Sequence, residues 1–229
     1  MNLKGLTAAV LLGISGAAQS YSVSFDLGDP VSAEGTYAHY ADAYNYEVEG
    51  VSMSVTGWSS GGDSFSPLGS ISAAQIGLWN NWMGVEGEGS MSPTMDNFGL
   101  DFDFLMFEFN QEVTLDGIGL GYIENDSDLS IATMEAGELL SVGSIYDADL
   151  GLNAVDAPAV ASSIWIIGAF HPSFGSIQDF SWDGFKLNEL SVDINPVPLP
   201  AAVWFLVTGL LGFGWLRRKA VKEDAKAAA

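Results

Sequence analysis

Apolar side chains recur at every second position along most of the chain between residues 21 and 194. In the stretch YNYEVEGVSMSV, Tyr44, Tyr46 and Val48 fall on one face, and a second alternating series begins after Gly50. A period of two is the period of a β-strand, and a glycine where the phase changes predicts a bulge or a bend. This alternation is the feature that most limits the fold.

The same pattern predicts several further strands. Residues 102–109, 113–122, 129–134, 163–170 and 185–194 each alternate or form short apolar runs, and turn-rich segments separate them. No stretch keeps a helical period over eleven residues. The best exception, Ile71 to Trp82, is compatible with one or two helical turns. We therefore predict one all-β domain over residues 21–194, an antiparallel β-sandwich or jelly roll.

The first 20 residues have the form of a secretory signal peptide. Lys4 supplies a positive charge, an apolar run extends from Leu6 to Ile14, and small residues follow. This run is too short to span a bilayer, which needs about 20 apolar residues. The predicted cleavage places Ala18 and Ser20 at the small-residue positions, although cleavage after Ala18 also fits. The alternative is an N-terminal core helix.

The C-terminal region contains a second apolar run, residues 201–216, followed by Arg217, Arg218 and Lys219. Sixteen residues, helped by their apolar flank, suffice for a short transmembrane helix. The basic cluster keeps its own side cytoplasmic and leaves the preceding domain outside. Residues 220–229 are then a cytoplasmic tail. A buried helix is the alternative, but three glycines would weaken it in water.

The residues before this run carry a recognisable motif: Val197, Pro198, Leu199, Pro200 and Ala201. Together with the apolar segment and the basic cluster, residues 195–219 resemble the VPLPA variant of the PEP-CTERM sorting signal. The resemblance implies that an exosortase-type enzyme of a Gram-negative bacterium recognises and cleaves the signal. The protein would be held transiently in the inner membrane and then delivered to the cell surface or the extracellular matrix.

The domain itself resembles the family of exosortase-dependent surface proteins. The similar stretches are GLWNNWMGV (77–85), SPTMDNFGLDFDFLMFEF (92–109), GIGLGYIENDSDLSI (117–131) and SWDGFKLNELSV (181–192). This resemblance implies a β-rich domain, and it brings no established catalytic residues with it.

Charge is distributed very unevenly. Residues 21–194 carry 27 acidic side chains against the single basic residue Lys186, a net charge of −26. Such a domain repels nucleic acid and anionic lipid and attracts divalent cations and basic surfaces. High solubility alone is the alternative explanation. The chain has no cysteine, which excludes disulfides, thiolate metal sites and a cysteine nucleophile.

Two acidic clusters supply the ligand type that calcium prefers, namely carboxylate and amide oxygens in loops. We predict a structural calcium site that draws on both clusters and on the residue before the last strand. Turn chemistry without any metal is the alternative. The candidate ligands are Asp96, Asn97, Asp126, Asp128 and Asp183.

Aromatic residues suggest carbohydrate binding. Trp79 and Trp82 flank Asn80 and Asn81 between glycine-rich segments, so an apolar platform lies next to hydrogen-bonding amides. Exopolysaccharide is the partner that this site would bind. Burial of both indoles in the core is the alternative.

Glutamates two residues apart raise the possibility of a glycosidase. In a strand, Glu47 with Glu49, or Glu86 with Glu88, would share one face about 7 Å apart, within the separation that glycoside hydrolysis requires. In so acidic a domain such spacings also arise by chance.

A histidine-based catalytic triad has little support. The only histidines are His39 and His171, both expected at surface or turn positions, and no serine has nucleophile-elbow neighbours. We therefore expect a non-enzymatic surface or matrix protein with a structural or adhesive role. The alternatives are a carbohydrate-binding or glycosidase-like secreted protein and a permanently anchored envelope protein.

Overall fold

The computed structural model describes residues 20–61, 70–86, 93–97, 101–135, 138–156, 160–173 and 181–194, which fall within one compact unit, Ser20–Asn195. These residues form fourteen strands and no helix, so the all-β prediction is confirmed. The strands are β1 (Tyr21–Asp26), β2 (Ser32–Glu34), β3 (Tyr40–Ala41), β4 (Ala43–Val48), β5 (Val51–Gly61), β6 (Ile71–Trp79), β7 (Trp82–Glu86), β8 (Met95–Asp96), β9 (Asp101–Ile123), β10 (Leu129–Glu135), β11 (Glu138–Ile145), β12 (Gly151–Ala154), β13 (Ala161–Ala169) and β14 (Gly184–Ile194).

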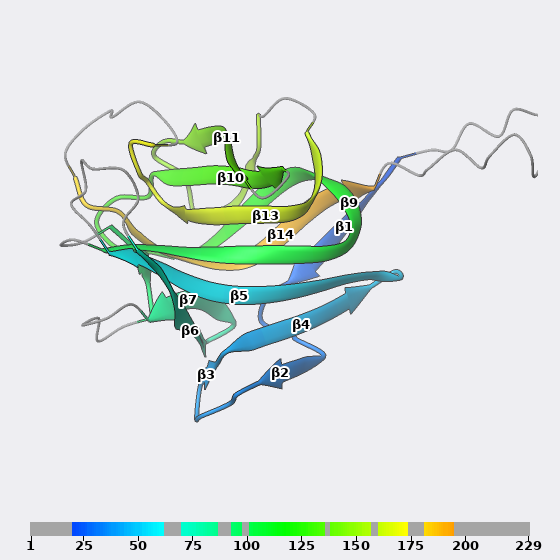
Figure 1. The fold of residues 1–229 in the computed structure, drawn as a ribbon, viewed down its shortest axis with the longest axis horizontal. Helices are drawn as coiled ribbons and strands as arrows, with labels where there is room; N and C mark the ends of the chain where they lie inside the picture. The colour runs from blue at the N-terminus through cyan, green and yellow to red at the C-terminus, as the bar shows by residue number, and fades with distance from the viewer. Residues whose placement is uncertain are drawn as a thin grey trace, which may run out of the picture. The chain divides into compact units, whose positions relative to one another are not determined.

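Strand β9 is the central element because its two halves belong to different layers (Figure 1). Its first half, up to Phe109, pairs antiparallel with β5 and β13. Its second half, from Thr114 to Ile123, pairs with β14. The register against β13 jumps from Glu108 to Val113, so β9 crosses between the layers at this irregularity.

The first layer contains β11, β10, β13, the first half of β9, β5, β4 and β2, and the second contains β1, β14, the second half of β9 and β12. The β6–β7 hairpin joins them on another side, since β6 pairs with β5 and β7 pairs with β14. Figure 1 shows β14 and β1 behind the strands of the first layer. In this sandwich-like arrangement, a polar groove is lined by residues of β1, β14 and the β6–β7 hairpin.

The core lies between the two layers. Leu105, Phe107 and Trp165 from the first layer and Phe25 and Leu190 from the second are at most 1% exposed. Alternation explains this burial, because every second side chain of a strand faces the same side. The Trp165 indole also donates from Nε1 to the Val113 carbonyl at 3.2 Å, which satisfies its one polar atom inside the core.

Two local predictions were wrong in detail. Gly50 marks neither a bulge nor a bend within a strand. It forms, with Glu49, a tight turn between β4 and β5 in which both residues have positive φ. Residues 71–82, the best helical exception, are β6, the β6–β7 turn and the first residue of β7. Glycine and asparagine adopt the positive φ values that such two-residue turns require. The turn-forming residues therefore decided the local structure, and the weak helical pattern did not.

Residues 1–19 of the predicted signal peptide and the whole C-terminal sorting segment lie outside the described residues. Among the residues that are described, no helix is long and apolar enough to cross a membrane.

Candidate functional site

The tip of the β6–β7 hairpin presents two amide side chains. Trp79 pairs with Trp82, and the intervening Asn80 and Asn81 have φ values of 51° and 67°. Asparagine tolerates the left-handed region better than other non-glycine residues, which is why this two-residue turn forms here. Asn81 packs on Gly28, where an added Cβ would lie 2.8 Å from the Asn81 Cγ. Both amides are exposed.

A β-bulge on β14 aims a third amide at the same place. Leu187 pairs with Leu120 and Glu189 pairs with Gly119, so Asn188 is an extra residue on its strand. Its backbone carbonyl accepts a hydrogen bond from Leu27 N at 2.9 Å. The buried Oδ1 of Asn188 accepts no hydrogen bond from the described residues. This oxygen faces the backbone of β9, because a Cβ added at Gly119 would lie 2.6 Å from it.

Strand β1 supplies polar groups beside this bulge. Asp26 lies directly opposite Glu189 in the antiparallel pairing of β1 with β14. The Ser24 hydroxyl donates to Glu189 Oε1 at 2.6 Å, and Gly28 N donates to Asp26 Oδ1 at 2.8 Å. These hydrogen bonds fix both carboxylates on the outer face of the second layer.

Trp82 forms an aromatic wall because its neighbour on β9 is a glycine. A methyl group on Gly121 would overlap the Cδ1 and Nε1 atoms of the indole, so only a bare backbone lets Trp82 lie on the sheet. The indole stacks on Tyr122, with ring centroids 5.9 Å apart and planes at 25°. Lys186 Nζ lies 5.4 Å from the centre of the Tyr122 ring. Burial lowers the pKa of Lys186, and the nearby Glu124 opposes this effect.

The Trp82 indole, the three amide residues and the polar residues of β1 and β14 line a polar groove of about 520 Å³. An aromatic face next to amides, carboxylates and a hydroxyl is the combination that recognises a sugar, since the ring stacks while hydroxyls form hydrogen bonds. We call this site the hairpin groove. Its lining residues are Ser24, Asp26, Asn80, Asn81, Trp82, Asn188 and Glu189.

The structure places three of the four predicted sugar-binding residues in the hairpin groove: Asn80, Asn81 and Trp82. Trp79 does not line it. Residue Trp79 is 42% exposed, and its ring lies 4.2 Å, centroid to centroid, from the His39 ring. The residues from β1 and β14 were not predicted, because they are distant in sequence from the hairpin. The only local sign of them was the alternating polar face of the segment YSVSFD.

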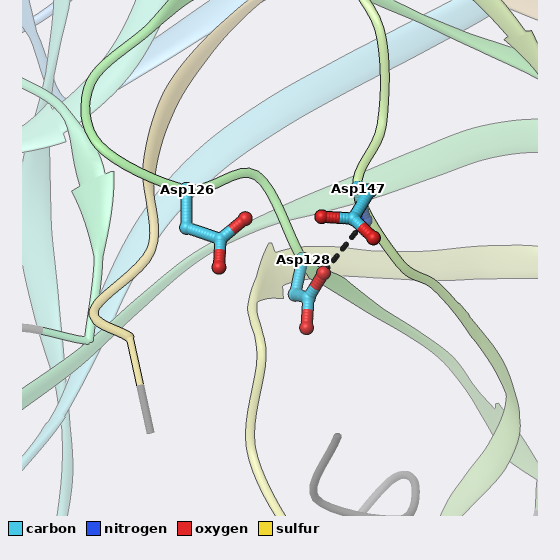
Figure 2. Close-up of side chains that lie close together, drawn as sticks. All are labelled: Asp126, Asp128 and Asp147. Atoms are coloured by element: carbon cyan, nitrogen blue, oxygen red, sulfur yellow. Dashed lines mark hydrogen bonds between the residues drawn. The ribbon is translucent and has the colours of Figure 1, made fainter. Parts of the chain in front are cut away.

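A separate cluster of carboxylates forms where the loop after β9 meets the segment between β11 and β12. One carboxylate oxygen from each of Asp126, Asp128 and Asp147 lies within 4.8 Å of the other two, and Figure 2 shows their side chains close together. Calcium–oxygen distances of 2.3–2.6 Å allow ligands of one ion to lie up to about 5 Å apart. The spacing of the three aspartates is therefore compatible with a shared cation. Asp147 N also donates to Asp128 Oδ1 at 2.7 Å.

Asp183 ties this cluster to the segment containing β8. Asp183 Oδ1 accepts from Asp128 N at 2.9 Å, and Asp183 Oδ2 accepts from Asn97 Nδ2 at 2.5 Å. Asp183 is only 2% exposed. Burial raises the pKa of Asp183 to about 7, and the neighbouring charges of Asp128 and Asp126 add to the increase. The Asp183 carboxylate thus connects loops by hydrogen bonds inside the domain.

Four of the five predicted calcium ligands are brought into this network: Asn97, Asp126, Asp128 and Asp183. Asp96 lies on β8, where its backbone pairs with Gly184, and it is not one of the three clustered aspartates. Asp147, which was not among the predicted ligands, completes the cluster. It follows β11 and has a positive φ of 49°. Its separation of 19 residues from Asp128 gave no local signal.

One of the two predicted glutamate pairs is not arranged as expected, and the other is only partly described. Glu47 lies on β4, but Glu49 belongs to the β4–β5 turn, so the two do not share a strand face. Glu86 ends β7, and Glu88 lies outside the described residues. None of the described glutamates of these pairs lines the hairpin groove.

The two histidines have different surroundings. His39 is exposed, as expected, but His171 is only 2% exposed. The Nδ1 atom of His171 accepts from Ser173 N at 3.0 Å, and its ring meets Phe102 edge-on with centroids 4.1 Å apart. Its burial corrects the expectation of a surface position, because the local sequence could not show that Phe102 covers it.

A second hollow, of about 420 Å³, lies on the face of the first layer and is lined mainly by apolar groups, including Trp58, Phe104, Met106 and Ile166. The strands that line it run into residues 62–69 and 98–100, which lie outside the described residues. We assign this hollow no function.

No protein-family model, curated protein or solved structure matches this chain.

Proposed function

We propose that this protein is an exported, non-enzymatic surface or extracellular-matrix protein whose β-domain binds polysaccharide through the hairpin groove. The observation that carries the proposal is the convergence of the Trp82 wall with Asn80, Asn81 and the Asn188 bulge in one polar groove. These groups match a sugar ring and its hydroxyls. In a biofilm, such binding would give the protein a structural or adhesive role.

Equilibrium binding to the exopolysaccharide of the bacterium that makes the protein tests this proposal. The full chain, held in mild detergent, should bind in the presence of a chelator, since the groove uses no metal. Trp82→Ala should weaken binding by at least about 2 kcal/mol, roughly thirtyfold, if the indole is the main platform. Trp58→Ala, which removes an indole from the other hollow, should leave the affinity unchanged.

A milder pair of variants guards against misfolding. Asn80→Gly removes an amide from the groove and keeps the positive φ of the turn, so it should reduce affinity without disturbing the hairpin. Asn125→Gly makes the same change at a residue with a φ of 66° outside the groove. Equal affinities of these two variants would contradict the proposed site, and the absence of any binding by the wild-type chain would remove the function.

The route to the surface is a separate part of the proposal. The signal peptide, the motif Val197–Ala201 and the basic residues Arg217–Lys219 support export, transient anchoring in the inner membrane and cleavage by an exosortase-type enzyme. The intact mass of the protein recovered from cells and matrix measures this directly. A mature chain that still contains residues 201–218 would instead indicate a permanently anchored envelope protein.

Calcium enters the proposal as a structural ion held by Asp126, Asp128 and Asp147. What supports it is the spacing of the three carboxylates and the buried Asp183 network behind them. An ion there would neutralise repulsion between the aspartates and fix the segment after β11 against the loop after β9.

A further inference from the structure

The hairpin groove contains two negative charges and no positive one. Asp26 and Glu189 lie directly opposite each other on paired strands, a position in which like charges repel. The one basic residue between positions 21 and 194, Lys186, is only 8% exposed and lies against the Tyr122 ring. A positively charged ligand would relieve this repulsion.

Both carboxylates are positioned to accept hydrogen bonds from a ligand. Asp26 Oδ1 is held by Gly28 N, and Glu189 Oε1 is held by the Ser24 hydroxyl. The second oxygens of both groups, Oδ2 and Oε2, accept no hydrogen bond from the described residues. Charged hydrogen bonds to an ammonium group are about twice as strong as neutral ones.

We propose that the hairpin groove selects glycans with free amino groups, whose ammonium groups bind Asp26 and Glu189 while a sugar ring stacks on Trp82. This inference rests on the proposed polysaccharide binding and names its ligand class, amino sugars without N-acetyl groups. Uronic-acid glycans are disfavoured, because their carboxylates would face Asp26 and Glu189 in a domain with a net charge of −26.

The test compares three short oligosaccharides of equal length on the full chain in mild detergent with chelator. They are glucosamine oligomers, their N-acetylated counterparts and uronic-acid oligomers, each at about pH 6, where carboxylates are charged and sugar amines are protonated. We expect the glucosamine oligomer to bind about tenfold more tightly than the N-acetylated one at low salt. This preference should shrink as salt screens the charges, and the uronic-acid oligomer should bind most weakly.

Matched variants separate a specific site from general attraction between a cation and an acidic protein. Asp26→Asn and Glu189→Gln keep the acceptors for Gly28 N and the Ser24 hydroxyl, so both should fold, and each should lose most of the tenfold preference. Asp193→Asn removes the same charge elsewhere on β14, where Asp193 accepts from Ser22, and should keep the preference.

Each outcome has a defined meaning. Equal binding of the amino and N-acetylated oligomers would overturn the inference and leave polysaccharide binding standing. Equal loss in Asp26→Asn and Asp193→Asn would also overturn it, because the attraction would then be non-specific. Failure of all three oligosaccharides and of the native exopolysaccharide would remove both the inference and the proposed function.

Discussion

Replacing Gly121 by alanine tests whether a bare backbone on β9 creates the Trp82 wall. A methyl group at this position would overlap the Cδ1 and Nε1 atoms of the Trp82 indole. The indole would have to leave the sheet and its stacking on Tyr122. Gly143 provides the control, since it is also a strand residue, lacks a positive φ and has no atom within 4 Å of an added Cβ.

The expected size of the effect follows from this geometry. Forcing an extra methyl group into a packed contact costs about 1–3 kcal/mol. Alanine also restricts the unfolded chain, which stabilises both variants by about 0.4–1 kcal/mol where the backbone allows it. Gly121→Ala should therefore be less stable than Gly143→Ala by about 1–3 kcal/mol. For a domain of this size, that difference lowers Tm by about 2–12 °C.

Thermal unfolding of the full chain in detergent, followed by near-ultraviolet circular dichroism, measures the difference in Tm. The folded-state spectrum reports the displaced indole, and glycan titration reports the groove. Gly121→Ala should lose stability, Trp82 signal and affinity together, while Gly143→Ala retains all three. If the two variants have the same Tm and the same glycan affinity, Gly121 does not position Trp82 and the reasoning is wrong.

Three further predictions concern stability. Asp183 has a folded-state pKa of about 7 against an ordinary value of 3.8. Its contribution to the free energy of unfolding is therefore complete below about pH 4 and is lost as pH rises to about 7. The loss in the free energy of unfolding is at most about 4 kcal/mol. Asp183→Asn should flatten the dependence of Tm on pH in that window. An unchanged slope would contradict this prediction. Calcium at a hundred times its Kd should stabilise the wild-type chain by about 2.7 kcal/mol and fail to do so in Asp147→Asn, whereas Asp149→Asn should behave as wild type. The same calcium response in both variants would exclude the cluster. Tyr46→Phe should lower the free energy of unfolding by about 1 kcal/mol, because the Tyr46 hydroxyl donates to the buried Leu27 carbonyl at 2.8 Å; chemical denaturation that shows no change would refute this.

Local patterns in the sequence predicted most of the strands. The runs at 102–109, 129–134 and 185–194 lie within strands, and the run at 163–170 extends one residue past the end of β13. An alternating apolar run buries one face when it forms a strand of a sheet. The same reasoning treated 102–109 and 113–122 as separate runs. In the structure they are parts of the single strand β9. The sequence did not indicate this, because the point at which a strand passes from one layer to the other has no local sequence signature.

The candidate sites were predicted only in part, for the same reason. Asn80, Asn81 and Trp82 were identified because they are adjacent in sequence, and their turn holds them together. Asp26 and Glu189 are partners only through the pairing of the first and last described strands. Asp147 joins Asp126 and Asp128 through the packing of two separate loops. No spacing rule could have connected these residues.

The sequence by itself determined the all-β class, the strongly negative charge and the motifs that predict the route of export, because these depend on composition and on the order of neighbouring residues. Only the tertiary structure decided which polar residues share a surface. The pairing of β1 with β14, the bulge at Asn188 and the contact of Trp82 with Gly121 are non-local, and together they form the hairpin groove. The physical reason is that strand order and register, which place distant residues side by side, are decided by packing of the whole domain.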